Sequence, residues 1–326
     1  MYSGDVMKKI FILSVLVFFL VGCTQNIYTH TDFALNTMVT VTLYGGDSSV
    51  LDESFNICRE YENILSRTVE GSDISKINRE GSAQVNPETA DIITKGIYYG
   101  HFSEGLFDIS IGAVSSLWDF LRAVSPPVHD EVMTALNTVD FREISVQGNN
   151  VSLGREGAQL DLGGIAKGYI ADKMARYIKS SGAEGAIINL GGNVVVLGNR
   201  GGKPFRVAIQ SPESPEKTFG VLHITDKSVV TSGIYERNFI YNGKEYHHIL
   251  NPETGYPHEN ELASVTVISD LSVDGDALST VLFLMGADKG IEAAEGLDGV
   301  EALFILRDGS FVKTSGIGSR IAFEQN

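Results

Sequence analysis

The segment from residue 159 to 182 places the strongest limit on the fold, because a strand, a glycine pair and a helix follow one another there. Residues 159–162 are typical of a short strand. Gly163 and Gly164 then allow a tight turn into a helix that ends at Gly182. Apolar residues recur along this helix at helical spacing: Ile170, Met174 and Ile178. A strand that turns directly into a helix predicts a domain in which both types of element pack together.

Helices and strands are mixed along the rest of the chain. Helices are predicted at these positions: 49–65, 73–78, 87–97, 276–285 and 288–297. Strands are predicted at these positions: 38–43, 151–153 paired with 159–162, 186–190 and 194–197, with short strands and turns from 205 to 270. Residues 123–131 contain two adjacent prolines and are expected to form a loop. No repeat or shift in composition divides the chain, so the prediction is a single α+β domain.

The N-terminus carries a separate signal. Two lysines precede an apolar run at 10–21, which is too short to span a membrane comfortably and ends at Gly22-Cys23. This pattern resembles a bacterial lipobox, which implies a signal peptide at 1–22, cleavage before Cys23 and lipidation of the Cys23 thiol. The alternatives are an ordinary signal peptide that contains a cysteine, or an N-terminal anchor helix.

The expected mature chain is a lipidated tether at 23–31 followed by a domain at 32–326. It would be anchored to the cell membrane on the periplasmic or other extracytoplasmic side. Cys58 would then have no cysteine partner. Its position on the apolar stripe of the helix at 49–65 predicts a core residue.

The charge of the chain restricts the class of ligand. Lysine and arginine number 25, and aspartate and glutamate number 41, which gives a formal net charge of −16. A general basic surface for nucleic acid is therefore excluded. An acidic chain also repels anionic phosphates unless a local cation offsets its field, so a phosphate substrate would point to a bound metal.

Asp161 to Tyr169 is the first candidate for a site. Its two glycines let the backbone approach a ligand, the helix that follows offers unpaired N–H groups to an anion, and Lys167 adds a positive charge. The segment matches neither the dinucleotide-binding glycine pattern nor a Walker A loop. A tight strand–helix turn with an exposed lysine is the alternative interpretation.

His247 and His248 form the second candidate. Adjacent residues on a strand point to opposite faces, so the two imidazoles do not easily ligate one metal. One of them could act as a general acid or base. The alternative is one exposed histidine and one packed histidine, followed by a turn at 251–255.

Two further segments could contact a ligand. Asp276 and Thr280 lie four residues apart on one predicted helix face, and their oxygens suit a hard cation such as Mg²⁺. The alternative is a helix cap with a mid-helix threonine. Phe107 and Asp108 follow Gly105 and could stack on and bond to a heterocycle, although Phe107 could equally be a core residue and Asp108 a turn residue.

Taken together and in order, these segments resemble the ApbE family. The resemblance rests on six segments: 103–118, 161–169, 189–193, 231–233, 247–255 and 276–280. It extends from about residue 32 to about residue 315. It implies a single ApbE-type, T-fold-like domain of mixed antiparallel sheets with packed helices.

The resemblance also implies roles for single residues. The Mg²⁺ ligands would be Asp276, Thr280 and the backbone carbonyl of Gly164, and His248 would be required for transfer. The implied contacts to the flavin nucleotide or its pocket are Leu35, Leu106, Phe107, Asp108, Asp161, Lys167 and Leu250. Thr68 lies near a position where many members carry a tyrosine that closes over the flavin.

The implied activity is an Mg²⁺-dependent FAD:protein FMN transferase. Such an enzyme moves FMN from FAD to a threonine or serine hydroxyl of an acceptor flavoprotein subunit and releases AMP. Thr68, and Asn36 where a glycine is usual, depart from the family pattern. Thr68 keeps open an FAD pyrophosphatase that gives FMN and AMP. A flavin-binding lipoprotein without catalysis is a second alternative.

Overall fold

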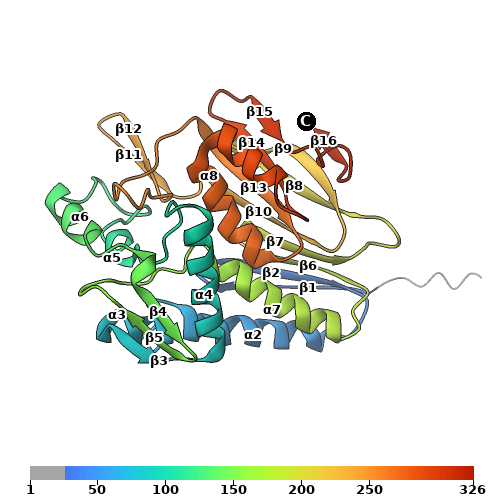
Figure 1. Cartoon of the computed structure of the whole chain (residues 1–326). Coiled ribbons are helices and arrows are strands. Elements are labelled where there is room, and N and C mark those ends of the chain that lie inside the picture. The colour runs from blue at the N-terminus through green and yellow to red at the C-terminus, as the bar shows by residue number, and fades with distance from the viewer. Residues whose placement is uncertain (1–25) are drawn as a thin grey trace, which may run out of the picture.

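A computed structural model describes residues 26–326 of the protein (Figure 1). The predicted signal peptide and Cys23 lie outside the described residues. Among residues 26–326, no helix is both long enough and apolar enough to span a membrane. The described part is a mixture of helices and antiparallel sheets, which confirms the α+β prediction.

A large antiparallel sheet forms the centre of the fold. Its strand order is β1-β2-β6-β7-β10-β13-β14-β15. The strands have these bounds: β1 Ile27–Ala34, β2 Thr37–Tyr44, β6 Gly185–Leu190, β7 Asn193–Gly198, β10 Lys227–Gly233, β13 Leu262–Ser269, β14 Glu301–Leu306 and β15 Phe311–Lys313. Every residue of β13 is buried, as expected for a central strand that is covered on both faces.

Two helices lie across one face of this sheet, α7 (Ala166–Ser180) and α8 (Ser272–Glu295), and α2 (Ser49–Leu65) packs beside α7 (Figure 1). The helices α7 and α8 approach closely at Gly168, where an added Cβ atom would lie 2.2 Å from the carbonyl oxygen of Ser272. Asp172 of α7 accepts hydrogen bonds from the amides of Ser272 and Val273 and so caps the start of α8.

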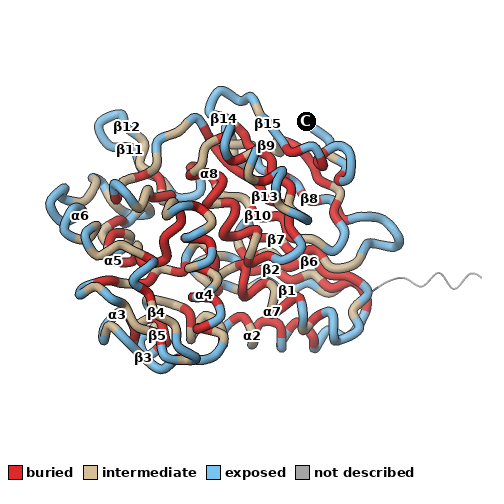
Figure 2. The backbone as a smooth tube through the Cα atoms, in the orientation of Figure 1, coloured by how far each residue is buried: buried red, intermediate tan, exposed pale blue. Residues whose placement is uncertain are grey.

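Smaller elements surround this core. The other face of the sheet is covered by the three-stranded sheet of β16, β9 and β8, whose apolar side chains pack against those of the central strands. The backbone in the middle of the molecule, where the central strands lie, is mainly buried (Figure 2). These elements have the following bounds: β8 Phe205–Ser211, β9 Ser214–Ile224, β16 Phe323–Gln325, α3 Asp73–Glu80, α4 Pro87–Phe102, α5 Gly112–Ser115, α6 His129–Leu136, η1 Phe141–Glu143, β3 Ser82–Gln84, β4 Ile144–Gln147, β5 Asn150–Leu153, β11 Asn238–Tyr241 and β12 Lys244–His247.

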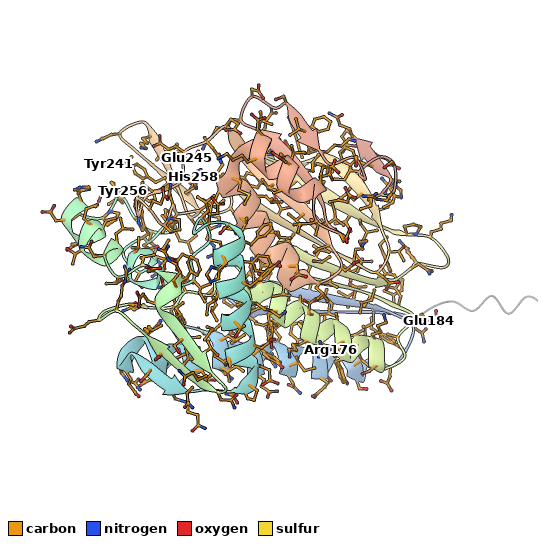
Figure 3. The ribbon with its side chains drawn as sticks, viewed as in Figure 1. Arg176, Glu184, Tyr241, Glu245, Tyr256 and His258 are labelled. Carbon is orange, nitrogen blue, oxygen red and sulfur yellow. The ribbon has the colours of Figure 1, made fainter. Side chains whose placement is uncertain are left out.

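The hairpin β11–β12 and the start of the described chain lie at opposite ends of the molecule (Figure 3). Tyr241, Glu245 and Tyr256 mark the end with the hairpin, whereas Glu184 marks the end where the described chain begins. The strand β1 begins at the Glu184 end, because Ile27 pairs with Tyr44 and Tyr44 pairs with Gly185. It ends at the turn that contains Leu35.

The apolar stripe predicted for residues 49–65 is confirmed. The helix α2 spans these same residues, and Cys58 is fully buried on its inner face. Burial raises the pKa of the Cys58 thiol to about 12, so the thiol stays protonated and unreactive at neutral pH. Cys58 is thus a core residue, as its position in the sequence indicated.

Two predictions about secondary structure need correction, and a third is confirmed. Residues 159–162 do not pair with 151–153, because β5 lies between β3 and β4 and Gln159 instead bridges to Ile111. The helix α6 begins within the expected loop at 123–131. The two helices predicted at 276–285 and 288–297 are confirmed as two helical segments of α8, which are separated by the non-helical Gly286, with φ 79° and ψ 174°.

Candidate functional site

Asp276 links the two segments that the sequence singled out for phosphate and metal binding. It lies on α8, is only 5% exposed, and its Oδ2 accepts a 2.8 Å hydrogen bond from the amide of Gly168. Burial raises the pKa of this carboxyl, and the positive charge of Lys167 opposes that rise. The start of α7 therefore supplies both a backbone donor and a cation to a buried carboxylate.

Thr280 lies one helical turn after Asp276 and is half-buried. Its Oγ1 is 3.4 Å from the Oγ of Ser232 on β10. A Cβ atom added to Gly164 would lie 3.6 Å from Thr280 Oγ1 and 3.0 Å from the ring of Phe107. The turn at Gly164, the Phe107 ring and the Thr280 hydroxyl thus meet at one point, which a side chain at position 164 would fill.

The types of oxygen donor that these residues carry are those that a hard cation takes. Mg²⁺ takes oxygen ligands and keeps several water molecules, so one carboxylate with a hydroxyl and a backbone carbonyl is a suitable set. Asp276, Thr280 and Gly164 offer these three types of donor. Among residues 26–326, no group of three or more histidine, cysteine, aspartate or glutamate side chains converges to hold a metal, so a site here depends on neutral oxygens beside the single carboxylate.

His248 directly follows β12 and extends its pairing with β11, because its amide donates to the carbonyl of Arg237 at 3.1 Å. Burial lowers the pKa of His248 to about 3, and the nearby charges of Arg237 and Lys167 contribute. The imidazole is therefore neutral at pH 7. Its Nδ1 is buried without a hydrogen-bond partner among the described residues, as is the Nδ1 of His247.

His247 has a different role from its neighbour. It is 2% exposed, and its Nε2 is 3.1 Å from the carbonyl oxygen of His258. Burial lowers the pKa of His247 to about 4. The structure thus makes His247 a packing residue and leaves His248 nearer to Lys167, as expected for adjacent residues at a strand end.

Glu236 is a member of this group that sequence reasoning missed. Its side chain contacts solvent, yet the protein atoms around its carboxyl reduce hydration and raise its pKa to about 6, against the effect of Lys167 and Arg237. Its Oε1 lies 3.6 Å from where a Cβ atom on Gly192 would be. The only signal in the sequence was its closeness to residues 231–233, because a single glutamate in a turn has no distinctive pattern.

Asp161 opens the turn that leads to Gly164. Its Oδ1 accepts a hydrogen bond from the Gly163 amide at 2.8 Å, and its Oδ2 accepts one from the Ser115 hydroxyl at 2.6 Å. Arg67 forms an ion pair with the same Oδ2, with a distance of 3.5 Å from its Nε. The carboxylate thus ties the turn to α5 and to the loop after α2.

Leu35 and Thr68 lie on two other loops. Leu35 has a positive φ of 54° in the tight turn between β1 and β2, and its amide donates to Glu62. Asn36 has φ 56° there, a conformation that asparagine tolerates better than most residues and that accounts for its replacement of glycine. Thr68 is exposed, with its hydroxyl 3.1 Å from Ser66 Oγ. Neither residue hydrogen-bonds to the group around Asp276.

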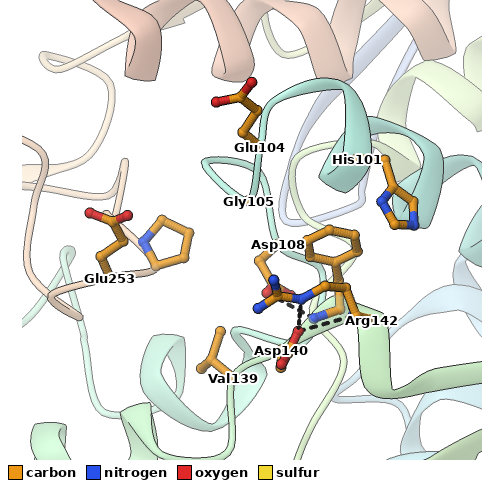
Figure 4. A pocket seen from close by; sticks show the side chains of 10 residues that line it. His101, Glu104, Gly105, Asp108, Val139, Asp140, Arg142 and Glu253 are labelled. Carbon is orange, nitrogen blue, oxygen red and sulfur yellow. Dashed lines mark hydrogen bonds and ion pairs between the residues drawn. The ribbon is translucent and has the colours of Figure 1, made fainter.

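Asp108 is held within the protein, because its carboxylate accepts hydrogen bonds from the Ser110 amide and hydroxyl and from the Phe141 amide. Burial raises its pKa. Asp108 lines a cavity of about 420 Å³ together with Arg142 and Glu253, which face each other across the opening in Figure 4. From the sequence, Asp108 could contact a ligand or hold a turn. The hydrogen bonds that its carboxylate accepts are those of a turn residue.

Three apolar candidates, Leu106, Phe107 and Leu250, are mainly packing residues. Phe107 is 5% exposed and also contacts Tyr99, with ring centroids 6.3 Å apart. Leu250 is 8% exposed, packs with Val114 and Trp118, and pairs through its backbone with Pro257. Leu106 is a partly buried neighbour of the main core. Of the three, Phe107 is the one that contacts the polar group, through its ring beside Gly164.

Comparisons with known proteins agree with this arrangement. The sequence profile of the ApbE family matches residues 35–304. The FAD:protein FMN transferase of Treponema pallidum (strain Nichols) is 32% identical over 321 residues, which cover 90% of this chain and 88% of that protein. The FAD:protein FMN transferase of Klebsiella pneumoniae (strain 342) is 32% identical over 298 residues, which cover 89% of this chain and 93% of that protein.

Solved structures give the same result. The ApbE protein of Thermotoga maritima superimposes with a TM-score of 0.82 at 29% identity, over 89% of this chain and 97% of that chain. The flavin transferase ApbE of Vibrio cholerae gives a TM-score of 0.79 at 25% identity, over 89% of this chain and 98% of that chain. The family profile, the relatives and the shared fold show that this chain belongs to the ApbE family.

Proposed function

We propose that the protein is an FAD:protein FMN transferase, which moves FMN from FAD to a threonine or serine hydroxyl of an acceptor protein and releases AMP. The observation that carries the proposal is the group around Asp276. A buried carboxylate, a lysine at a helix start and a neutral histidine meet there in a chain of net charge −16. The activity named for the relatives supports the same function.

The reaction exchanges one phosphorus–oxygen bond for another. The acceptor hydroxyl oxygen forms a bond to the phosphorus of the FMN half, and the bond from that phosphorus to the oxygen of AMP breaks. The proton of the hydroxyl passes to the neutral imidazole of His248. Lys167 and the amides at the start of α7 stabilise negative charge on the phosphates. Positioning and electrostatics are the main contributions that a protein makes to such a transfer.

Asp276, Thr280 and the Gly164 carbonyl would hold Mg²⁺, which supplies positive charge to the pyrophosphate oxygens when it is bound. The charge balance of the chain supports this assignment. Lys167 already interacts with two carboxylates, those of Asp276 and Glu236. One lysine shared in this way does not offset a pyrophosphate as well, so a further cation is needed.

An FAD pyrophosphatase is the second candidate. It uses the same group of residues, with water in place of the acceptor hydroxyl, and gives FMN and AMP. Thr68 favours it, because this short and exposed side chain stands where the family resemblance implies a tyrosine that closes over the flavin. A flavin-binding protein without catalysis has no need for a neutral histidine and a buried carboxylate near the same lysine.

The expected lipid anchor is part of the same proposal. Cys23 would attach the chain to the cell membrane, with the domain on the extracytoplasmic side. The described chain begins near Glu184, at the end of the molecule opposite the hairpin β11–β12 that leads into His248 (Figure 3). This arrangement turns the His248 end away from the point where the anchor would join, and leaves it accessible to an acceptor protein.

Incubation of the protein with FAD and Mg²⁺, with chromatography for AMP, tests for chemistry at the site. Release of AMP is expected, in larger amounts when an acceptor with an accessible threonine is present. If no AMP forms with or without an acceptor, the protein only binds flavin. If AMP and free FMN form but a validated acceptor stays unlabelled, the activity is that of a pyrophosphatase.

A further inference from the structure

Asn193 is a buried polar residue that has no part in the reaction described above. It is the first residue of β7, is fully buried, and pairs with Val230 of β10. Its Oδ1 accepts a hydrogen bond of 2.7 Å from the hydroxyl of Ser272, at the start of α8. The hydroxyl of Ser228 on β10 donates in turn to Ser272 Oγ at 2.9 Å. Three buried side chains thus connect the central sheet to α8.

These hydroxyls determine which way the Asn193 amide is turned. The oxygen of a side-chain amide only accepts hydrogen bonds, and its nitrogen only donates them. Because Ser272 accepts a proton from Ser228, it can give its own proton to Asn193, which holds the Asn193 oxygen on the Ser272 side. The Nδ2 of Asn193 therefore points away from Ser272.

The Asn193 nitrogen faces Asp276. Asp276 lies one helical turn after Ser272, so the two residues share a face of α8. The Nδ2 of Asn193 makes no hydrogen bond of normal geometry to any residue between 26 and 326. It still acts on Asp276, because burial raises the pKa of this carboxyl and the Asn193 amide is one of the groups that oppose the rise.

A purely structural role does not account for this arrangement. Buried N–H groups that lack a good hydrogen bond cost free energy, and Asn193 keeps two of them next to a carboxylate. Such an arrangement is typical of the shell around a metal site, where outer groups orient the side chains that hold the ion. The amide of Gly168 binds Asp276 Oδ2 from α7, and Asn193 approaches the same carboxylate from β7.

We propose that Asn193 is a positioning residue of the metal site, whose side-chain amide holds the Asp276 carboxylate in the orientation that binds the cation. Ser272 acts one step further out and keeps the donor side of the Asn193 amide turned towards Asp276. The inference rests on the proposed function only in taking Mg²⁺ as the ion at Asp276. With Gly168 on one side and Asn193 on the other, the carboxylate is fixed relative to both α7 and the sheet.

Equilibrium binding of Mn²⁺, a probe for the Mg²⁺ site, tests the proposal without any turnover. The EPR signal of free Mn²⁺ measures it. N193A is expected to bind Mn²⁺ about 10–100-fold more weakly than the wild type, the usual effect of losing an outer-shell group. S272A should also weaken binding, because the Asn193 amide can then turn its oxygen towards Asp276. The double variant should bind like N193A, since Ser272 acts only through Asn193.

N260A is the matched control for a structural effect on α8. The Asn260 amide donates to the carbonyl of Phe283 at 2.6 Å, about two helical turns beyond Asp276. N260A is expected to lower the melting temperature and to keep the Mn²⁺ affinity of the wild type. The melting temperature of every variant is measured in parallel.

Wild-type Mn²⁺ affinity in N193A would overturn the proposal and leave the transferase assignment intact. If N193A does not fold, S272A decides in the same way. A loss of affinity in N260A as large as that in N193A would also overturn the proposal, because loosening of α8 would then be the cause. A wild-type protein that binds Mn²⁺ but releases no AMP from FAD would instead contradict the proposed function.

Discussion

Gly168 and Asp276 are 108 residues apart in the sequence, and a 2.8 Å hydrogen bond joins the amide of Gly168 to Oδ2 of Asp276. This bond connects the start of α7 to the first turns of α8. The close approach of the two helices at Gly168 makes it possible. The turn that we propose to bind phosphate and the carboxylate on α8 are thereby held together.

Loss of the Asp276 carboxylate should abolish the reaction. D276A is expected to lower the rate of AMP release about a thousandfold, because a bound metal ion contributes several kcal/mol to charge stabilisation. Excess chelator should have the same effect on the wild type. The rate of AMP release, with the melting temperature as a control for folding, checks both. Full activity in D276A or in chelator would count against the metal assignment.

His248 should matter for transfer more than for binding. H248A is expected to bind FAD like the wild type but to transfer FMN about 10²–10⁴-fold more slowly, the range for loss of a general base. Flavin fluorescence measures binding, and covalent flavin on the acceptor measures transfer. Equal transfer rates in the two proteins would remove His248 from the mechanism.

The lowered pKa of His248 predicts how stability depends on pH. Its pKa falls from 6.5 to about 3 on folding, mainly through burial. Between these values the unfolded chain binds a proton that the folded chain does not, so acidification below pH 6.5 favours unfolding. Relative to H248Q, the wild type should lose about 2 kcal/mol of unfolding free energy between pH 8 and pH 5.

Urea unfolding of both proteins at pH 8 and pH 5 measures this difference. His247 titrates in the same direction in both proteins, with a pKa lowered to about 4, so its effect cancels in the comparison. An identical loss of stability in the wild type and in H248Q would show that the His248 imidazole is protonated in the folded state.

A methyl group at position 168 should separate α7 from α8. In G168A the new Cβ atom would lie 2.2 Å from the Ser272 carbonyl, so the backbone must shift. Overpacking of this kind typically lowers the free energy of unfolding by about 1–3 kcal/mol. G296A is the matched control, because its Cβ atom would approach other atoms only to 3.5 Å. Equal stability of the two variants would contradict the close packing.

The candidate site was predictable from the sequence where short segments carried the information. Asp276 and Thr280 share a helix face because of their spacing, and Gly164 lies next to Lys167 in the same turn. The two histidines differ in their surroundings, as alternation on a strand requires. In each case the geometry follows from neighbours within one element.

Contacts between distant segments were not predictable in this way. Glu236 acquires its raised pKa because the fold surrounds its carboxyl with protein atoms and brings Asp276 near it, against the effect of Lys167 and Arg237. Arg67 meets Asp161 across two loops, and no local pattern indicates that pair. The predicted pairing of residues 159–162 with 151–153 was wrong for the same reason. Gln159 bridges instead to Ile111, which is farther away in the sequence.

Incubation of the wild-type protein with FAD, Mg²⁺ and a threonine-bearing acceptor, read for AMP and for covalent flavin together, tests the central claim most directly. One AMP is expected for each flavin bound to the acceptor, and replacement of the acceptor threonine by alanine should abolish the label. A validated acceptor that stays unlabelled while FAD is consumed would contradict the transferase assignment.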